Sequence, residues 1–325
     1  MTCKSGASAQ KYAPIKRRLR LRLTGRQNRL MTNLLRLCSL IALALLAFAA
    51  NSVLCRLALS DGLIDPASFT VVRLLSGAFT LGLLCGLQSL TSRTDGIEKV
   101  WSEGSWLSAI ALFVYATGFS YAYVTLETGV GALILFGAVQ LTLIVLTMLA
   151  GQKLAGLEWL GLVIAFMGFA YLVLPTLSSP SLVGFILMSV AGVAWGLYTW
   201  RGKRSTKPLF ATTSNFVRTL PMLGLVLLVV SINKTTSMQM EGVGYALVSG
   251  ALMSGLGYAL WYAVLPYLSA SLSAVLQLLV PVIATIGGVI FANESITLHL
   301  VIATSAVLGG VMLVILGKKR PSKNA

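Results

Sequence analysis

Ten apolar stretches dominate the sequence, and each is long enough to cross a lipid bilayer as a helix. A helix rises about 1.5 Å per residue, and the hydrocarbon core needs about 20 apolar residues. Charged residues make up only 10% of the chain, against about 25% in soluble domains. The sequence therefore predicts an all-α polytopic membrane protein with ten transmembrane helices near 34–58, 66–88, 105–125, 129–149, 155–174, 181–200, 212–232, 241–265, 271–291 and 297–317.

The net charge of +16 is concentrated at one side of the predicted membrane. Residues 1–33 form a basic tail without an acid, and residues 318–325 form a second basic tail. Positively charged connections stay in the cytoplasm, so both termini are expected there, in a bacterial inner membrane. This setting favours contact with the lipid bilayer over nucleic acid for the basic tail. Met31 is an alternative start of the chain, and the sequence leaves both starts open.

The spans fall into two groups of five, residues 34–174 and 181–317. An odd number of crossings inverts the second group relative to the first, as in carriers built from inverted repeats. Short matches support this: Asn51 in the first span aligns with Trp195 in the sixth, and Arg73 in the second aligns with Arg218 in the seventh. The sequence predicts two inverted five-helix repeats.

Three amide side chains lie near the middle of predicted spans: Asn51, Gln140 and Gln277. In hydrocarbon such groups need partners, either on a neighbouring helix or in a substrate. Both interpretations are open for each residue, but three amides near one depth favour a shared cavity. Pro281, four residues after Gln277, removes a helical donor. We expect Pro281 and Pro221 to kink their helices or to take part in gating.

Aromatic residues and arginines offer further candidate contacts. Tyr115, Trp195 and Tyr258 lie deep enough to form cavity walls with polar edges, although plain helix packing explains them equally well. Arg73 and Arg218 either contact an anionic group or anchor helix ends through backbone carbonyls, and the anchor interpretation is favoured.

The sequence shows no pattern of catalytic or metal-binding residues. The four cysteines lack metal-ligand spacing, and the single histidine, His299, begins the last span. Every acidic residue lies in or beside a connection, and Glu127 comes nearest to the membrane interior. We therefore expect no cofactor, no enzymatic activity and no proton coupling through an embedded carboxylate. Small residues at Gly161, Gly168 and Gly310 predict close helix packing, between the halves or in a homodimer.

Several segments resemble the EamA family of the drug/metabolite transporter superfamily. They are DPASFTVVRLLSGA at the second span, TGVGALILFGAVQLT at the fourth, SNFVR at the seventh and SAVLQLLVPVIATIGGVIFANESIT at the ninth. The resemblance implies a central cavity between inverted repeats, with Asn51, Tyr115, Gln140, Trp195, Tyr258 and Gln277 on or near the substrate path. It leaves the substrate open among amino acids, other metabolites, nucleotide sugars and drugs.

The sequence thus predicts an alternating-access carrier, exporting small organic metabolites such as amino acids. The alternatives are a drug-efflux or nucleotide-sugar carrier of the same fold and, from other classes, a membrane-embedded enzyme or a non-transporting scaffold. A scaffold predicts that the three amides bond only to neighbouring helices and enclose no cavity.

Overall fold

The computed structural model describes residues 7–91, 98–151, 155–173, 181–203, 205–233, 237–268, 273 and 276–317, and of these it describes the backbone alone at 7–33, 91, 98–99, 173, 181 and 229–233. The chain divides into two units, residues 1–42 and residues 43–325. In the described part of the first unit the chain is the N-terminal portion of α1. The helix packing and the candidate site described below lie in the second unit.

Helices account for the regular structure of the described residues, apart from one isolated bridge between Ile64 and Met238. The elements are α1 (Ala7–Ser60), α2 (Pro66–Thr91), α3 (Glu98–Ser102), α4 (Trp106–Ala122), α5 (Thr128–Leu149), α6 (Gly156–Val173), α7 (Ser181–Gly202), α8 (Pro208–Asn233), α9 (Met240–Val248), the π-helix η2 (Ser249–Leu256), α10 (Gly257–Val264), the 3-10 turn η3 (Leu265–Tyr267), α12 (Leu279–Phe291) and α13 (Leu298–Gly317).

Six helical segments are long and apolar enough to cross a membrane: Leu34–Ser60, Pro66–Leu90, Thr128–Leu149, Leu182–Gly202, Met240–Tyr267 and Leu298–Gly317. Trp106–Ala122, Gly156–Leu172 and Leu279–Phe291 are shorter apolar helices. Large apolar side chains such as Phe79 and Phe166 are exposed on the helix surfaces. A soluble protein avoids extended surfaces of this kind, so these side chains face lipid. The chain is a multi-pass helical membrane protein.

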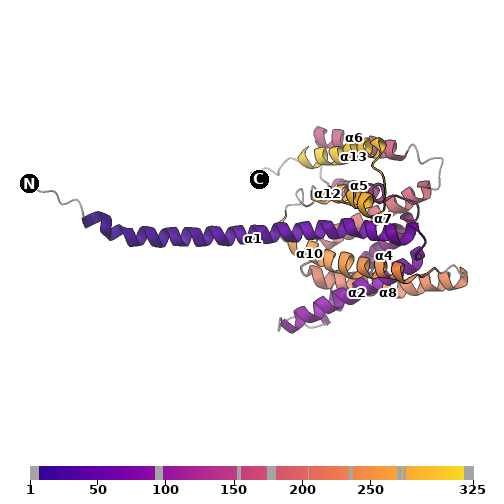
Figure 1. Ribbon diagram of the computed structural model, residues 1–325, viewed down its shortest axis with the longest axis horizontal. Coiled ribbons are helices and arrows are strands. Elements are labelled where there is room, and N and C mark those ends of the chain that lie inside the picture. Colours follow the sequence, from indigo (N-terminus) through magenta and orange to yellow (C-terminus); the bar gives the residue numbers. More distant parts are fainter. Residues whose placement is uncertain are drawn as a thin grey trace, which may run out of the picture. The chain divides into compact units, whose positions relative to one another are not determined.

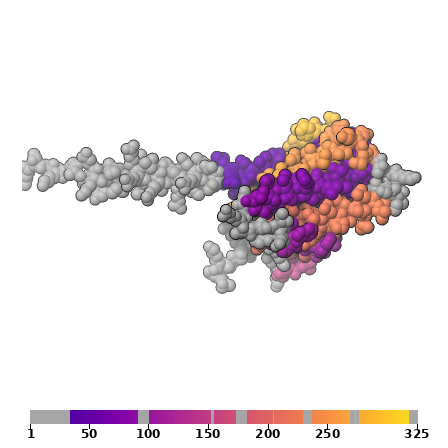
Figure 2. All heavy atoms as spheres, turned by 90° about the horizontal axis from the view of Figure 1, so that it is seen from below, coloured from indigo at the N-terminus to yellow at the C-terminus, as the bar shows by residue number. Residues whose placement is uncertain are grey.

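Helices far apart in the sequence pack side by side. Helix α6 packs on α13, and α4 and α5 both pack on α7 (Figure 1). Helix α2 packs along η2 and α8, and in Figure 2 its purple surface lies between the salmon and orange surfaces of the later helices. Helices from the first and second halves of the chain therefore build one bundle, and the interior of that bundle holds the candidate site.

The contact between α6 and α13 depends on glycines. A Cβ atom at Gly161 would lie 2.5 Å from the carbonyl oxygen of Gly310, and one at Gly310 would lie 2.5 Å from the backbone nitrogen of Ala165. Backbone atoms cannot move away as a flexible side chain can, so glycine is required for this approach. The expectation of close packing through these small residues is confirmed, and the packing lies within one chain.

Three elements differ from the helices expected from the sequence. Residues 7–33, expected as a tail, belong to α1. The stretch expected as one helix over 241–265 contains the π-helix η2, where one wider turn replaces regular α-helical hydrogen bonding. The stretch 271–291 is divided at Leu278, and α12 begins at Leu279. Pro281 therefore lies in the first turn of α12, where its missing N–H needs no helical acceptor.

Candidate functional site

Arg73, in the first third of α2, is buried in the bundle with only 1% of its surface exposed. Its Nη2 donates a hydrogen bond to Tyr115 Oη of α4 (2.9 Å), and its Nε donates one to Ser254 Oγ of η2 (3.2 Å). The guanidinium carbon lies 4.7 Å from the ring centre of Phe119, within cation–π range. Arg73 thus joins three elements by side-chain contacts instead of anchoring a helix end to backbone carbonyls.

The Arg73 charge has no acidic partner among the residues that the structure describes. Its Nη1 atom is buried and makes no hydrogen bond there. A buried charge without a counter-charge is expensive, and inside a membrane it is typical of a functional position. The expected anchor geometry instead belongs to Arg218, whose Nη1 and Nη2 donate to the carbonyls of Glu103 (3.0 Å) and Trp101 (2.9 Å).

The three aromatic residues proposed as cavity walls lie together beside Arg73. The Trp195 ring of α7 is 4.8 Å from the Tyr115 ring and 4.9 Å from the Tyr258 ring of α10, measured between centres. Trp195 also stacks on Tyr198 at 5.3 Å. These distances are typical of packed aromatic pairs. Helices from both halves of the chain therefore meet in one aromatic cluster, which we call the Trp195 cluster (Tyr115, Trp195, Tyr198 and Tyr258).

The π-helix η2 contacts two of the polar residues singled out in the sequence. Ser254 accepts from Arg73, and Ser249 donates from its hydroxyl to Oδ1 of Asn51 in α1. The Asn51 amide therefore has a neighbouring-helix contact in this conformation. π turns inside α-helices occur frequently at functional sites, and the glycines and serines of Ser249–Leu256 do not by themselves specify one.

The other two amides are also buried, on a separate pair of helices. Gln140 of α5 is 3% exposed, and Gln277, just before α12, is 6% exposed. Helices α5 and α12 pack on each other. The sequence therefore located buried amides correctly, while the structure distributes them between η2 and the α5–α12 pair.

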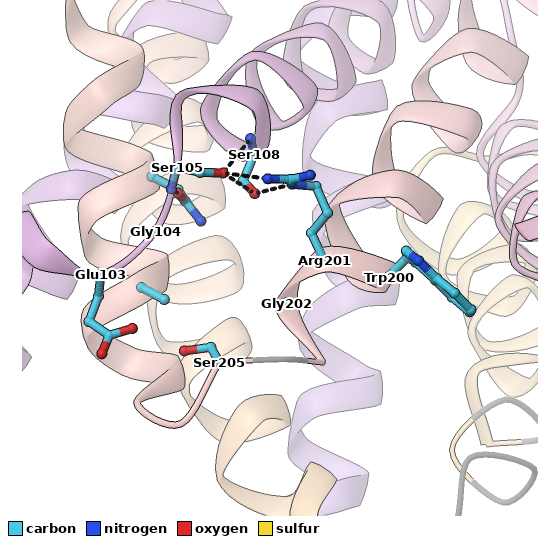
Figure 3. Close-up of a pocket in the computed structure, with 10 residues that line it drawn as sticks. Glu103, Gly104, Ser105, Ser108, Trp200, Arg201, Gly202 and Ser205 are labelled. Atoms are coloured by element: carbon cyan, nitrogen blue, oxygen red, sulfur yellow. Dashed lines mark hydrogen bonds between the residues drawn. The ribbon is translucent and has the colours of Figure 1, made fainter. Parts of the chain in front are cut away.

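A cavity of about 340 Å³ opens at the end of the bundle where α4 begins and α7 ends. Arg201 points into it, and its Nε and Nη2 donate to Ser108 Oγ (3.2 Å) and Ser105 Oγ (3.3 Å) (Figure 3). Asn215 of α8 holds the start of α4 by accepting from the Ser105 N–H (2.9 Å). Gly202 and Ser205 line this cavity and also a second one of about 380 Å³. This end is hollow and carries positive charge.

The opposite end of the bundle is tied by an ion pair between Arg56 Nε and Glu294 Oε1 at 3.3 Å. Glu294 also accepts from the backbone N–H of Thr128 at 2.8 and 2.9 Å, and from its hydroxyl at 3.0 Å. Arg56 donates to the carbonyls of Tyr123 and Val124. We call these contacts the Arg56–Glu294 clasp: they join the end of α1, the turn before α5 and the turn after α12.

The sequence interpretation did not assign a role to Arg56 or Glu294. Glu294 follows Asn293, whose φ of 52° lies in the left-handed region. That turn aims the carboxylate at the start of α5, where free N–H groups and the helix dipole favour a negative charge. An acidic residue directly after a turn-forming asparagine was the available signal, but its partner is 166 residues away.

Glu127 lies in the same turn, outside the membrane-spanning segments. Its pKa is raised, chiefly because the carboxyl loses water on packing and also because Glu294 is negative, while Arg56 opposes the rise. Glu127 therefore binds a proton more readily than an ordinary glutamate. It remains exposed, so the effect is modest.

Comparisons with known proteins assign this helical membrane protein to a family. The EamA-like transporter family matches residues 182–316. A Pseudomonas aeruginosa protein described as uncharacterized is 46% identical over 276 residues, covering 85% of this chain and 93% of the relative. An uncharacterized transporter of Archaeoglobus fulgidus is 25% identical over 221 residues, covering 66% of this chain and 79% of the relative. The chain belongs to the EamA-like transporter family of the drug/metabolite transporter superfamily, as its motifs indicated.

A solved crystal structure shares the fold. It matches with a TM-score of 0.60 at 18% sequence identity and covers 86% of this chain and 99% of the other. At this identity the match concerns the arrangement of helices alone. The family and the fold together define a membrane transporter.

Proposed function

We propose that the protein is an alternating-access carrier that exports small organic metabolites such as amino acids. The two halves of the bundle rock against each other around a central site and open it to one side at a time. The Trp195 cluster supplies the apolar walls of that site, and Asn51, Gln140 and Gln277 orient polar groups of the substrate.

The single observation that carries this proposal is the difference between the two ends of the bundle. One end contains the Arg201 cavity, and the Arg56–Glu294 clasp ties the other. A carrier needs such an arrangement in each of its end states, because access to the central site must alternate. A scaffold has no need for a hollow polar end that lies next to a buried aromatic cluster.

The packing supports ten crossings in two inverted halves: the six long spans, the three shorter apolar helices and α8. The halves are α1 to α6 and α7 to α13, with α3 as a short connection. Equivalent helices then pair with each other: α2 with α8, α5 with α12 and α6 with α13. The contact of α4 with α8 likewise has a counterpart in the contact of α2 with α9 and η2. A two-fold relation between inverted repeats generates pairs of this kind.

Charge supports an orientation with both termini in the cytoplasm of a bacterial cell and the bundle in its inner membrane. Arg201, Lys203 and Lys207 all lie at the end of the bundle with the cavities, and positive charge is typical of the cytoplasmic side. The conformation is then open to the cytoplasm, ready to load a substrate for export. A homodimer would use surfaces other than the Gly161–Gly310 contact, which α6 and α13 already occupy.

The test is uptake into liposomes that contain the purified protein, with a pooled set of labelled amino acids and related metabolites, with and without a pH gradient. We expect uptake above that of empty liposomes. Uptake without a gradient supports facilitated diffusion. Uptake that needs a gradient indicates proton coupling, for which Glu127 is the first candidate residue. If no solute in the pool enters faster than into empty liposomes, the proposal fails for this substrate class.

A further inference from the structure

We infer that Arg73 is the residue that recognises a carboxylate or another anionic group on the transported solute. This inference rests on the carrier function proposed above and names the chemical class of its substrate. It goes beyond the family assignment, which leaves the charge of the substrate open.

The first argument is the unbalanced charge of Arg73. The guanidinium is 1% exposed and lies within the apolar span Pro66–Leu90, and the described residues offer it hydroxyl groups and aromatic rings but no carboxylate. Hydroxyls and rings stabilise such a charge only in part. An anionic solute would provide the missing counter-charge when it binds.

The second argument is the donor left over on the same side chain. Nε and Nη2 are held by Ser254 and Tyr115, while Nη1 is buried without a hydrogen-bond partner in the described part of the chain. The two bonds fix the plane of the guanidinium, so Nη1 is already oriented. An arginine prepared in this way suits an anionic group such as a carboxylate, because the N–H groups of Nη1 can donate charge-assisted hydrogen bonds to its oxygens.

The third argument is the backbone that surrounds Arg73. Gly250 of η2 lies against the Arg73 backbone, and a Cβ atom there would overlap the Arg73 carbonyl oxygen. The π turn and this close approach bring the Ser254 hydroxyl to the Arg73 Nε atom. Two costly features, a π turn and a buried charge, thus meet at one place, as is typical of a binding site.

The fourth argument is a route from the cavity. On α4, Ser108 lines the cavity and Tyr115 bonds to Arg73; the two are seven residues apart and share one face of the helix. On α7, Arg201 lines the cavity, and Tyr198 and Trp195 follow at three-residue steps toward the Trp195 cluster. An anion attracted by Arg201 would pass the aromatic rings, about two helical turns away, to reach Arg73.

Arg218 provides the natural comparison, because it occupies the equivalent place in the second half. Its two terminal nitrogens both donate to backbone carbonyls, which supports a structural role. Variants of the two arginines can therefore be compared, and the comparison separates loss of anion recognition at Arg73 from the effect of removing any positive charge from the bundle.

The experiment compares solutes that differ at one group, which is either a carboxylate or its neutral carboxamide. Solutes from the pool that the reconstituted protein transports are each tested as competitors beside their neutral carboxamides, with unlabelled compound added outside. We expect the carboxylate to compete at least about tenfold better than the carboxamide, which corresponds to about 1.4 kcal/mol. Arg73→Gln should reduce this ratio to near one, Arg73→Lys should retain part of it, and Arg218→Gln should retain it in full.

Two results would overturn the inference while leaving the carrier function standing: equal competition by acid and amide in the unmodified protein, or an unchanged ratio in Arg73→Gln. If Arg73→Gln does not fold, the unmodified protein and Arg73→Lys still decide the matter. Failure of the carrier function is recognised separately, because the unmodified protein would then transport no solute in the pool. That result removes the basis of the inference as well.

Discussion

Removing the Glu294 carboxylate should open the tied end of the bundle. In Glu294→Ala the start of α5 loses a capping acceptor, and Arg56 loses its ion-pair partner. Loss of a helix cap costs about 1 kcal/mol. The ion pair adds about 1 kcal/mol at most, since its side chains are still 20% and 10% exposed. The sum of about 2 kcal/mol corresponds to a shift of about 30-fold between closed and open states.

Hydrogen exchange measured by mass spectrometry on the reconstituted protein tests this expectation directly. The Thr128 N–H is the donor that Glu294 binds, so peptides covering the start of α5 should exchange faster in Glu294→Ala. Peptides from the α6–α13 contact should keep their protection, because that contact involves other residues.

Glu241→Ala is the matched control. Glu241 is an exposed carboxylate near the start of α9 whose described partner, Tyr245, lies one turn away in the same helix. Its loss removes a negative charge without untying separate helices, so exchange at α5 should stay as in the unmodified protein. Equal exchange at α5 in Glu294→Ala and Glu241→Ala would refute the reasoning that the clasp closes this end.

Three further changes have distinct expected outcomes. Gly310→Val should lower the free energy of unfolding by about 1–3 kcal/mol through overlap with α6, whereas Gly309→Ala, where a Cβ meets open space, should change the melting temperature in detergent little; equal melting temperatures would contradict the packing argument. Glu127 has a raised pKa in the folded protein, so its stabilising contribution is present below the unfolded pKa and is lost as the pH rises through the folded pKa. Thermal melts of Glu127→Gln should lack this part of the pH dependence, and an unchanged pH profile would show that Glu127 does not cause it. Gln277→Leu should impair transport while the protein still inserts into the membrane, and unchanged flux would remove Gln277 from the site.

The membrane class and most helix positions follow from the sequence because they depend on local composition. A helix over Thr128–Leu149 matches the apolar stretch 129–149 closely. Glycines at Gly161 and Gly310 pointed to close packing, because small residues let helix backbones approach. Such features depend on residues that are close together in the sequence, so they can be predicted from a single sequence.

The site depends on contacts between distant residues, and these were harder to predict. Tyr115, Trp195 and Tyr258 were singled out by depth alone, and the structure brings them together. Arg73 was expected to anchor a helix end through backbone carbonyls, yet the structure buries it. Depth in a span does not show whether a side chain faces lipid, a surface or the interior, and only the neighbours settle that.

The π-helix and the clasp mark the limit of local reasoning most clearly. Residues 249–256 include glycines and serines, which lower helix propensity without specifying a π turn, and this segment packs on α2. Glu294 is an acidic residue that can accept hydrogen bonds and pair with a cation, but its partners lie in α1 and α5. Thr128 is 166 residues earlier in the sequence. Pairings of this kind are properties of the fold. The sequence around either partner does not indicate which distant residue it will contact.

The clasp and Arg73 act at different stages of the proposed cycle. The clasp contributes only about 2 kcal/mol, so it holds one end closed without locking it. Arg73 lies between α4 and η2, elements from opposite halves, and its bonds to Tyr115 and Ser254 connect them. An anion that engages Nη1 would bind both halves through one guanidinium, so its affinity depends on how the halves are arranged. A ligand shifts a conformational equilibrium only by its difference in affinity for the two states. Binding at Arg73 can therefore supply that difference in affinity. A clasp that contributes about 2 kcal/mol is weak enough for this binding energy to open it.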